Sequence, residues 1–118
     1  MDREEMKRRT KRFALQVIEL VESLPRGRAT EVLGRQLLKS GTSVGANYCA
    51  SCRAKSRPDF ISQMTIVEEE AYETIYWLEL LAEAGIVKLD IIQPLLREAD
   101  ELLAITISSI RTAKQNRK

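Results

Sequence analysis

Apolar residues recur at steps of three and four in four stretches of this chain, and this spacing constrains the fold more than any other feature. Phe13, Val17 and Leu20 show it in the first stretch, and Ile75 and Leu78 show it in the third. A period of 3.6 residues is typical of an amphipathic helix, whereas a half-buried strand alternates with a period of two. The pattern predicts helices over about 3–24, 30–54, 57–84 and 91–114.

The breaks in this pattern fall between the predicted helices. Pro25 disfavours helix in the residue before it. Ser56 and Asp59 have the spacing of a capping box, Gly85 is typical of a helix C-terminus, and Asp90 resembles a helix start. Four long helices joined by short breaks predict a single domain over 1–118 with an all-α, up-and-down four-helix bundle fold.

Composition excludes several classes of protein. The longest unbroken apolar runs are four residues, far short of the roughly 18 that a membrane span needs, and no secretion signal is evident. Two cysteines without an export signal favour a reducing compartment, so we expect a cytoplasmic protein. The chain has no histidine, which removes the commonest catalytic base and metal ligand. We expect no enzyme activity, no catalytic residue, no metal and no cofactor.

Two local patterns have structural interpretations that we favour. Gly41 and Gly45 lie inside the second predicted helix, where each glycine costs about 1 kcal/mol relative to alanine. Close packing of a neighbouring helix would offset that cost, and a ligand-contacting groove is the alternative. Asn47, at the edge of the same core stripe, is a candidate for a buried hydrogen bond that sets helix register.

Two further patterns suggest metal or redox chemistry, but the rest of the chain does not support it. Cys49 and Cys52 form a CxxC pair late in a predicted helix, where the helix dipole opposes thiolate formation. A structural zinc site needs four ligands, and the chain offers two cysteines and no histidine. The glutamates at 68–70 and Glu73 lack the Glu-x-x-His pattern of a di-metal bundle.

Two motifs resemble one protein family over nearly the whole chain, from about Phe13 to Arg111. The stretch SGTSVGANY at 40–48 resembles a signature of the four-helix-bundle proteins encoded in intervening sequences of bacterial 23S ribosomal RNA genes. The stretch EAYETIYWL at 70–78, preceded by DFI at 59–61, resembles a second signature of that family. The family often continues with an Arg-Glu pair after Asn-Tyr, whereas Cys49 follows here, so no charged role is carried over to that point.

The resemblance implies an up-and-down bundle that assembles as a cyclic homopentamer. It also implies similarity to the accessory proteins of diversity-generating retroelements, which bind nucleic acid and a reverse transcriptase. It carries over no catalytic residue.

Bundle topology turns a bland net charge of +2 into a strongly polarised one. In an up-and-down bundle the N-terminus, the second connection and the C-terminus share one end. That end gathers 13 basic and four acidic residues, a net charge of +9, and leaves −7 for the remainder. The candidate nucleic-acid-binding residues are Lys7, Arg8, Arg9, Lys11, Arg12, Arg53, Lys55, Arg57, Arg111, Lys114, Arg117 and Lys118, with Arg3 in the same group.

A positive pole of this size attracts polyanions, because lysine and arginine displace counterions from phosphates. We expect binding to the RNA or DNA backbone with little sequence preference, since no base-reading motif is evident. Solubilising charged tails are the alternative interpretation of the same residues.

Several large apolar residues lie off the core stripes of the predicted helices. Exposed aromatic and aliphatic side chains are enriched in interfaces, so we expect these residues to form a subunit interface. Burial of helix flanks within the bundle is the alternative. If the chain binds no nucleic acid, we expect a scaffolding module that binds a protein partner. The candidate interface residues are Leu15, Ile18, Ile66, Tyr76, Trp77, Leu80 and Ile105.

Overall fold

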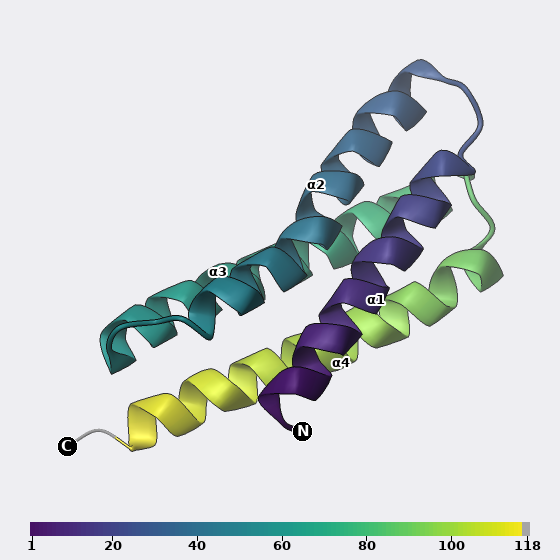
Figure 1. Ribbon diagram of the computed structural model, residues 1–118. Coiled ribbons are helices and arrows are strands. Elements are labelled where there is room, and N and C mark those ends of the chain that lie inside the picture. The colour runs from purple at the N-terminus through teal and green to yellow at the C-terminus, as the bar shows by residue number, and fades with distance from the viewer. Residues whose placement is uncertain (117–118) are drawn as a thin grey trace.

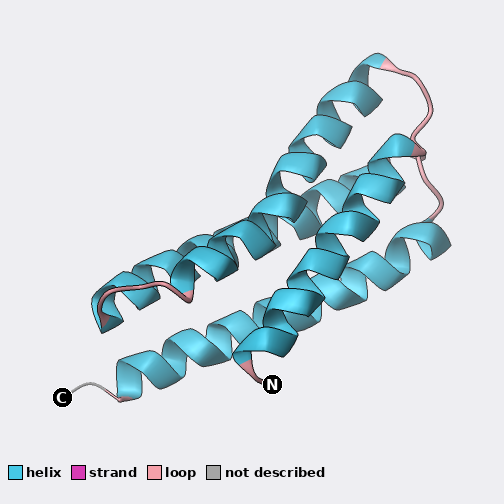
Figure 2. Cartoon of the chain, in the orientation of Figure 1, coloured by secondary structure: helices cyan, strands magenta, loops and turns pink. Residues whose placement is uncertain are grey.

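The computed structural model describes residues 1–116, which form four α-helices and no strand. Helix α1 spans Arg3–Glu22, α2 spans Arg28–Ser51, α3 spans Arg57–Glu83 and α4 spans Leu89–Gln115 (Figure 1). Short turns join these helices (Figure 2). Successive helices run in opposite directions, which confirms the predicted all-α, up-and-down four-helix bundle.

The helix ends follow local capping chemistry. Asp2 Oδ1 accepts a hydrogen bond of 2.8 Å from the Glu5 N–H at the start of α1. Ser56 Oγ accepts one of 3.1 Å from the Asp59 N–H at the start of α3, as its spacing predicted. Helix α3 ends before Gly85, which adopts a positive φ of 75°, a conformation that glycine tolerates best.

Two helix starts differ from the prediction. Helix α2 begins at Arg28, because Gly27 takes the N-cap position. Helix α4 begins at Leu89, with Lys88 as the N-cap, so the expected start at Asp90 is wrong. The chain reverses within a few residues of Gly85, which leaves the residues before Asp90 free to join the first turn of α4.

The four helices form a rod with extents of 52 × 21 × 21 Å. Each helix packs against its neighbours in the chain, α1 also packs lightly against α4, and the pairs α1–α3 and α2–α4 do not pack together in the described residues. Helices α1 and α3 therefore occupy opposite corners of the bundle. The start of α1, the last turn of α4 and the α2–α3 connection lie toward one end, and the other two connections lie at the opposite end (Figure 1).

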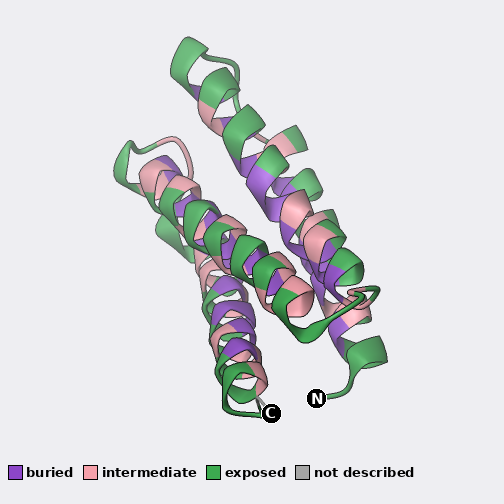
Figure 3. Cartoon of the chain, turned by 90° about the vertical axis from the view of Figure 1, so that its left-hand side faces the viewer, coloured by how far each residue is buried: buried purple, intermediate pink, exposed green. Residues whose placement is uncertain are grey.

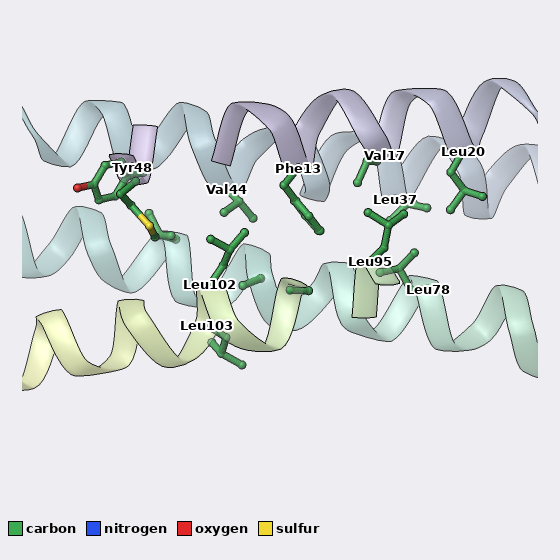
Figure 4. Packing of buried hydrophobic residues seen from close by; sticks show 14 of the residues in the cluster. Phe13, Val17, Leu20, Leu37, Val44, Tyr48, Leu78, Leu95, Leu102 and Leu103 are labelled. Atoms are coloured by element: carbon green, nitrogen blue, oxygen red, sulfur yellow. The ribbon is translucent and has the colours of Figure 1, made fainter. Parts of the chain in front are cut away.

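The core of the described residues consists mainly of aliphatic side chains, with one phenylalanine, one tyrosine, two methionines and two alanines. Phe13 and Val17 from α1 face Leu37 and Val44 from α2 and Leu102 from α4 across the bundle axis (Figure 4). Burial runs as a stripe along each helix, with exposed residues on the outer faces (Figure 3). Each fully buried large aliphatic side chain contributes about 1.5–3 kcal/mol to folding.

Two glycines of α2 let α1 approach closely. A Cβ atom on Gly41 would lie 2.9 Å from both Cγ atoms of Val17, and one on Gly45 would lie 3.2 Å from Thr10 Cβ. Real Cβ atoms essentially never lie as close as the first of these distances. The structure thus confirms close helix packing as the reason for these glycines.

A pair of buried hydroxyl groups joins α2 to α3. Thr74 Oγ1 lies 3.0 Å from Ser40 Oγ and 2.7 Å from the carbonyl oxygen of Glu70. The register role considered for Asn47 is not seen, because its amide donates to the Ser43 carbonyl oxygen of its own helix. Ser40 and Thr74 make the contact between helices instead.

Candidate nucleic-acid interface

The candidate interface comprises the N-terminal half of α1, the α2–α3 connection and the last turns of α4. The connection and the last turns of α4 lie at one end of the rod (Figure 1). Arg9 pairs with Glu98 and Glu101 in the first half of α4, so the N-terminal half of α1 lies beside the middle of that helix. We call this interface the basic pole, and define it by the basic residues that the sequence assigned to that end. Burial raises the pKa of Tyr48 in the last turns of α2, and the charge of Arg3 partly offsets that rise, which indicates that the start of α1 lies near the end of α2. Arg117 and Lys118, two of the predicted residues, lie outside the described residues.

Most of the described cations of the basic pole are free to meet a ligand. They are exposed and make no ion pair with any residue between 1 and 116: Arg8, Lys11, Arg12, Arg53, Lys55, Arg57, Arg111 and Lys114. Lys7 is half-buried and lies 3.4 Å from Glu4 Oε2, a pairing that water screens strongly.

Arg9 differs from this group because two carboxylates of α4 already hold it. Its Nε lies 2.7 Å from Glu98 Oε2, and one terminal nitrogen lies 2.8 Å from Glu98 Oε1 and 2.6 Å from Glu101 Oε1. These hydrogen bonds raise the pKa of Arg9 further, so its charge is permanent. The geometry makes Arg9 a link between α1 and α4, and its charge is satisfied within the chain.

Two cations of the basic pole lie where their own helix disfavours them. Arg3 and Arg57 are the first residues of α1 and α3, at the positive ends of the helix dipoles. A cation in the first turn costs roughly 0.3–1 kcal/mol, whereas Lys114 in the last turn of α4 is favourable. Helix stability alone therefore does not explain the cations at these two positions.

The predicted subunit-interface residues divide into two groups. Leu15, Ile18, Ile66 and Tyr76 are exposed, at 60%, 38%, 36% and 54% of their surfaces. Leu80 is half-buried, and Trp77 and Ile105 are half-buried and pack against the core, as the alternative of buried helix flanks expects. Other exposed apolar residues were not part of the predicted interface: Met1, Val32, Tyr72, Leu89 and Ile91.

Tyr76 and Trp77 form an aromatic pair on α3. Their ring centroids are 5.0 Å apart, with the planes at 74°. Trp77 Nε1 is buried and has no hydrogen-bond partner among the described residues. The ring is therefore held mainly by packing, and Tyr76 presents the more accessible aromatic surface.

The outer face of α3 carries a group of acidic residues near the middle of the helix. Glu69 and Glu73 are exposed, and Glu70 is half-buried beside them. Burial and the charge of Glu73 raise the pKa of Glu70, while Lys39 of α2 lowers it. This face is thus opposite in sign to the exposed face of α1.

A family model describes residues 3–108 of the chain as a 23S rRNA-intervening sequence protein. The chain belongs to this family. A solved structure of an S23 ribosomal protein family member of unknown function from Bacteroides thetaiotaomicron is similar to this intervening-sequence protein, with 34% identity and a TM-score of 0.84. The match covers 89% of this chain and 97% of that one. No curated protein matches this chain.

The cysteines of this 23S rRNA-intervening sequence protein are free, with Cys49 exposed and Cys52 half-buried. Cys52 contacts Tyr48, and burial together with this thiol raises the pKa of the Tyr48 phenol to about 12. Residues 1–116 contain no group of three side chains that is suited to hold a metal ion. None of the described helices has both the length and the apolar character needed to span a bilayer.

Proposed function

We propose that this 23S rRNA-intervening sequence protein binds the sugar–phosphate backbone of RNA or DNA through its basic pole, without enzymatic activity. The observation that supports the proposal is that the start of α1, the α2–α3 connection and the last turns of α4, which all bear cations in the sequence, lie toward one end of the rod (Figure 1). Exposed lysines and arginines release counterions from phosphates, and this release drives sequence-independent binding. The free thiols fit a cytoplasmic setting.

The same surface favours backbone contacts over base contacts. Tyr48, the aromatic residue beside the basic pole on α2, is 9% exposed and offers no stacking platform. The exposed aromatics Tyr72 and Tyr76 lie on the middle and later turns of α3, away from the α2–α3 connection. Base stacking on aromatic rings is the usual route to single-strand recognition, so we expect little sequence preference.

We further propose that copies of the chain assemble head to tail, with α1 of one copy against α3 of the next. Leu15 and Ile18 lie beside the basic residues Lys11 and Arg12 on the exposed face of α1. On α3, Ile66 and Tyr76 lie beside Glu69 and Glu73. Both charge and apolar character are therefore complementary.

A head-to-tail contact of this kind repeats around a ring if the rotation closes. Because α1 and α3 occupy opposite corners of the bundle, each copy offers both halves of the contact at once. A cyclic homopentamer, as the family resemblance implies, would turn its basic poles toward a common face. That face would present several copies of the pole to one nucleic acid, without Lys11 and Arg12, which the contact between copies would cover.

Fluorescence anisotropy with a labelled single-stranded RNA, measured across a salt series, tests the proposed binding. If about five phosphates of the single strand are contacted, the affinity should fall about a hundred-fold between roughly 50 and 200 mM salt. The double variant Arg53→Gln/Lys55→Gln should weaken binding at every salt concentration and reduce the salt slope by about 1.4. The matched control Lys88→Gln/Arg97→Gln, which removes the same charge outside the pole, should have a much smaller effect.

Two results would contradict the proposal. Binding that is absent at low salt would favour a scaffolding module that binds a protein partner and no nucleic acid. Equal losses in the two double variants would show that net charge matters and the position of the pole does not.

A further inference from the structure

An open hollow of about 730 Å³ lies at the α1–α2 connection, at the end of the rod opposite the basic pole. Its rim carries three arginines, Arg26, Arg28 and Arg35. Arg35 pairs with Glu31 at 2.9 Å, which neutralises the carboxylate at the rim. Arg26 and Arg28 are exposed and form no ion pair with described residues, so the hollow has an excess of positive charge.

The floor of the hollow is the uncapped start of α2. Gly27 is the N-cap and provides no side-chain hydrogen bond, unlike Asp2 of α1 and Ser56 of α3. The first intrahelical bond runs from the Glu31 N–H to the Gly27 carbonyl oxygen at 3.0 Å. The N–H groups of 28–30 form no hydrogen bond within the described residues and remain available as donors.

A second observation, independent of the helix end, is the hydroxyl group of Thr30. This side chain is only 8% exposed, lines the hollow, and makes no hydrogen bond with any described residue. The hydroxyls of the other buried serines and threonines of residues 1–116 each make one: Thr10, Ser40, Ser51, Thr74 and Thr106. The Thr30 oxygen is not sealed from the hollow, since it is not among the fully buried side-chain atoms without a partner, so a ligand bound there can reach it.

We propose that this hollow binds a phosphate group, either free or at the end of an organic phosphate monoester. The backbone N–H groups, the Thr30 hydroxyl and two guanidinium groups are all donors, and a phosphate oxygen accepts from each kind. Val21 and Leu24 form an apolar wall beside these donors, with space for an organic part. The inference does not depend on the proposed nucleic-acid binding, because the two surfaces lie at opposite ends of the rod.

Amide chemical shifts of the full chain at constant ionic strength, recorded by NMR, test the site with three probes: inorganic phosphate, AMP and adenosine. Phosphate and AMP should shift the amides of 28–30 in a saturable way, and adenosine should leave them unchanged. Tighter binding of AMP than of phosphate identifies a monoester as the ligand class, and equal affinity identifies free phosphate.

Two variants separate the site from general charge effects. Gly27→Asp places a capping carboxylate over the same donors, and its Cβ would lie 3.1 Å from Thr30 Oγ1, so phosphate affinity should fall at least tenfold while the Tm holds or rises. Thr30→Val keeps the side-chain shape and should weaken binding several-fold. The control Arg97→Gln should leave the affinity unchanged.

The inference is overturned if Gly27→Asp keeps the affinity of the parent chain. It is also overturned if the shifts are as large at the starts of α1 and α3, or if adenosine shifts the same amides as AMP. The variant Arg53→Gln/Lys55→Gln should still bind phosphate at 28–30, so failure at the basic pole and failure at this hollow are distinguishable.

Discussion

The charge of Arg9 is already neutralised by carboxylates of the same chain. Arg9 lies among free cations on α1, yet its guanidinium is shared between Glu98 and Glu101 of α4. The side chains of Arg9 and Glu98 are only 22% and 24% exposed, so water screens this pair less than a surface pair. Forked contacts of arginine with carboxylates are among the stronger hydrogen bonds in proteins.

Arg9→Gln should therefore change stability and leave nucleic-acid binding nearly unchanged. Loss of the charge-assisted bonds, with Glu98 left half-buried and unpaired, should cost roughly 1.5–3 kcal/mol in urea unfolding. The matched variant Arg8→Gln removes an exposed cation one residue away and should show the reverse pattern. A stable Arg9→Gln protein with weakened RNA binding would contradict this assignment.

The sequence alone could not predict the pairing of Arg9 with Glu98, for a physical reason. The helical period shows which face of α1 is buried, but the rotation of α1 against α4 depends on the packing of the whole core. Arg9 and Glu98 are 89 positions apart, and Ser40 and Thr74 are 34 apart, so no local pattern links them. Spacing predicted the Ser56 cap and the Gly85 helix end because both depend on residues within a few positions.

At the scale of elements, α1 is attached to the bundle in two different ways. Against α2 it lies on a surface that Gly41 and Gly45 keep flat. Against α4 it packs lightly and is fastened by Arg9. The glycines therefore set how near α1 lies to α2, and with it the position of half the basic pole.

Gly41→Ala should destabilise the bundle although alanine is the better helix former by about 1 kcal/mol. The new Cβ would overlap the Val17 side chain, and overpacking of this kind costs roughly 1–3 kcal/mol. Thermal unfolding should show a lower Tm for Gly41→Ala than for the parent chain. The substitution Val17→Ala should lower the stability less in the Gly41→Ala background than in the parent chain.

Gly34→Ala is the graded control for this experiment. Its Cβ would lie 3.3 Å from Leu24 Cδ1, the far end of a flexible side chain, so a much smaller loss or a gain is expected. If both glycine variants were equally stabilised, close packing at Gly41 would not be a constraint.

For the whole molecule, the main feature is the separation of charge along and across the rod. The basic pole occupies one end, and an acidic outer face of α3 lies diagonally opposite the basic face of α1. The position of the α2–α3 connection and of the last turn of α4 at one end was predictable from the order of the helices. The small hollow at the α1–α2 connection was not, because Arg26, Arg28 and Arg35 were counted within a remainder of net negative charge.

The proposed assembly predicts that Leu15→Asp weakens self-association and leaves the fold intact. Leu15 is 60% exposed, so the change affects little of the core, but it places an acid against the acidic face of α3. Sedimentation equilibrium should show smaller species than the parent chain forms, with unchanged circular dichroism. The control Val32→Asp alters an equally accessible residue of α2, 53% exposed, and should not change the mass.

An even number of antiparallel helices has a practical consequence for anyone who handles this protein. An affinity tag or fluorescent fusion at either terminus is tethered next to the very surface whose binding is to be measured, and a cationic or bulky tag would alter the result. A label carried on the turn around Lys88 would sit at the far end of a rod 52 Å long. A label at that turn would allow nucleic-acid binding to be measured without masking the basic pole.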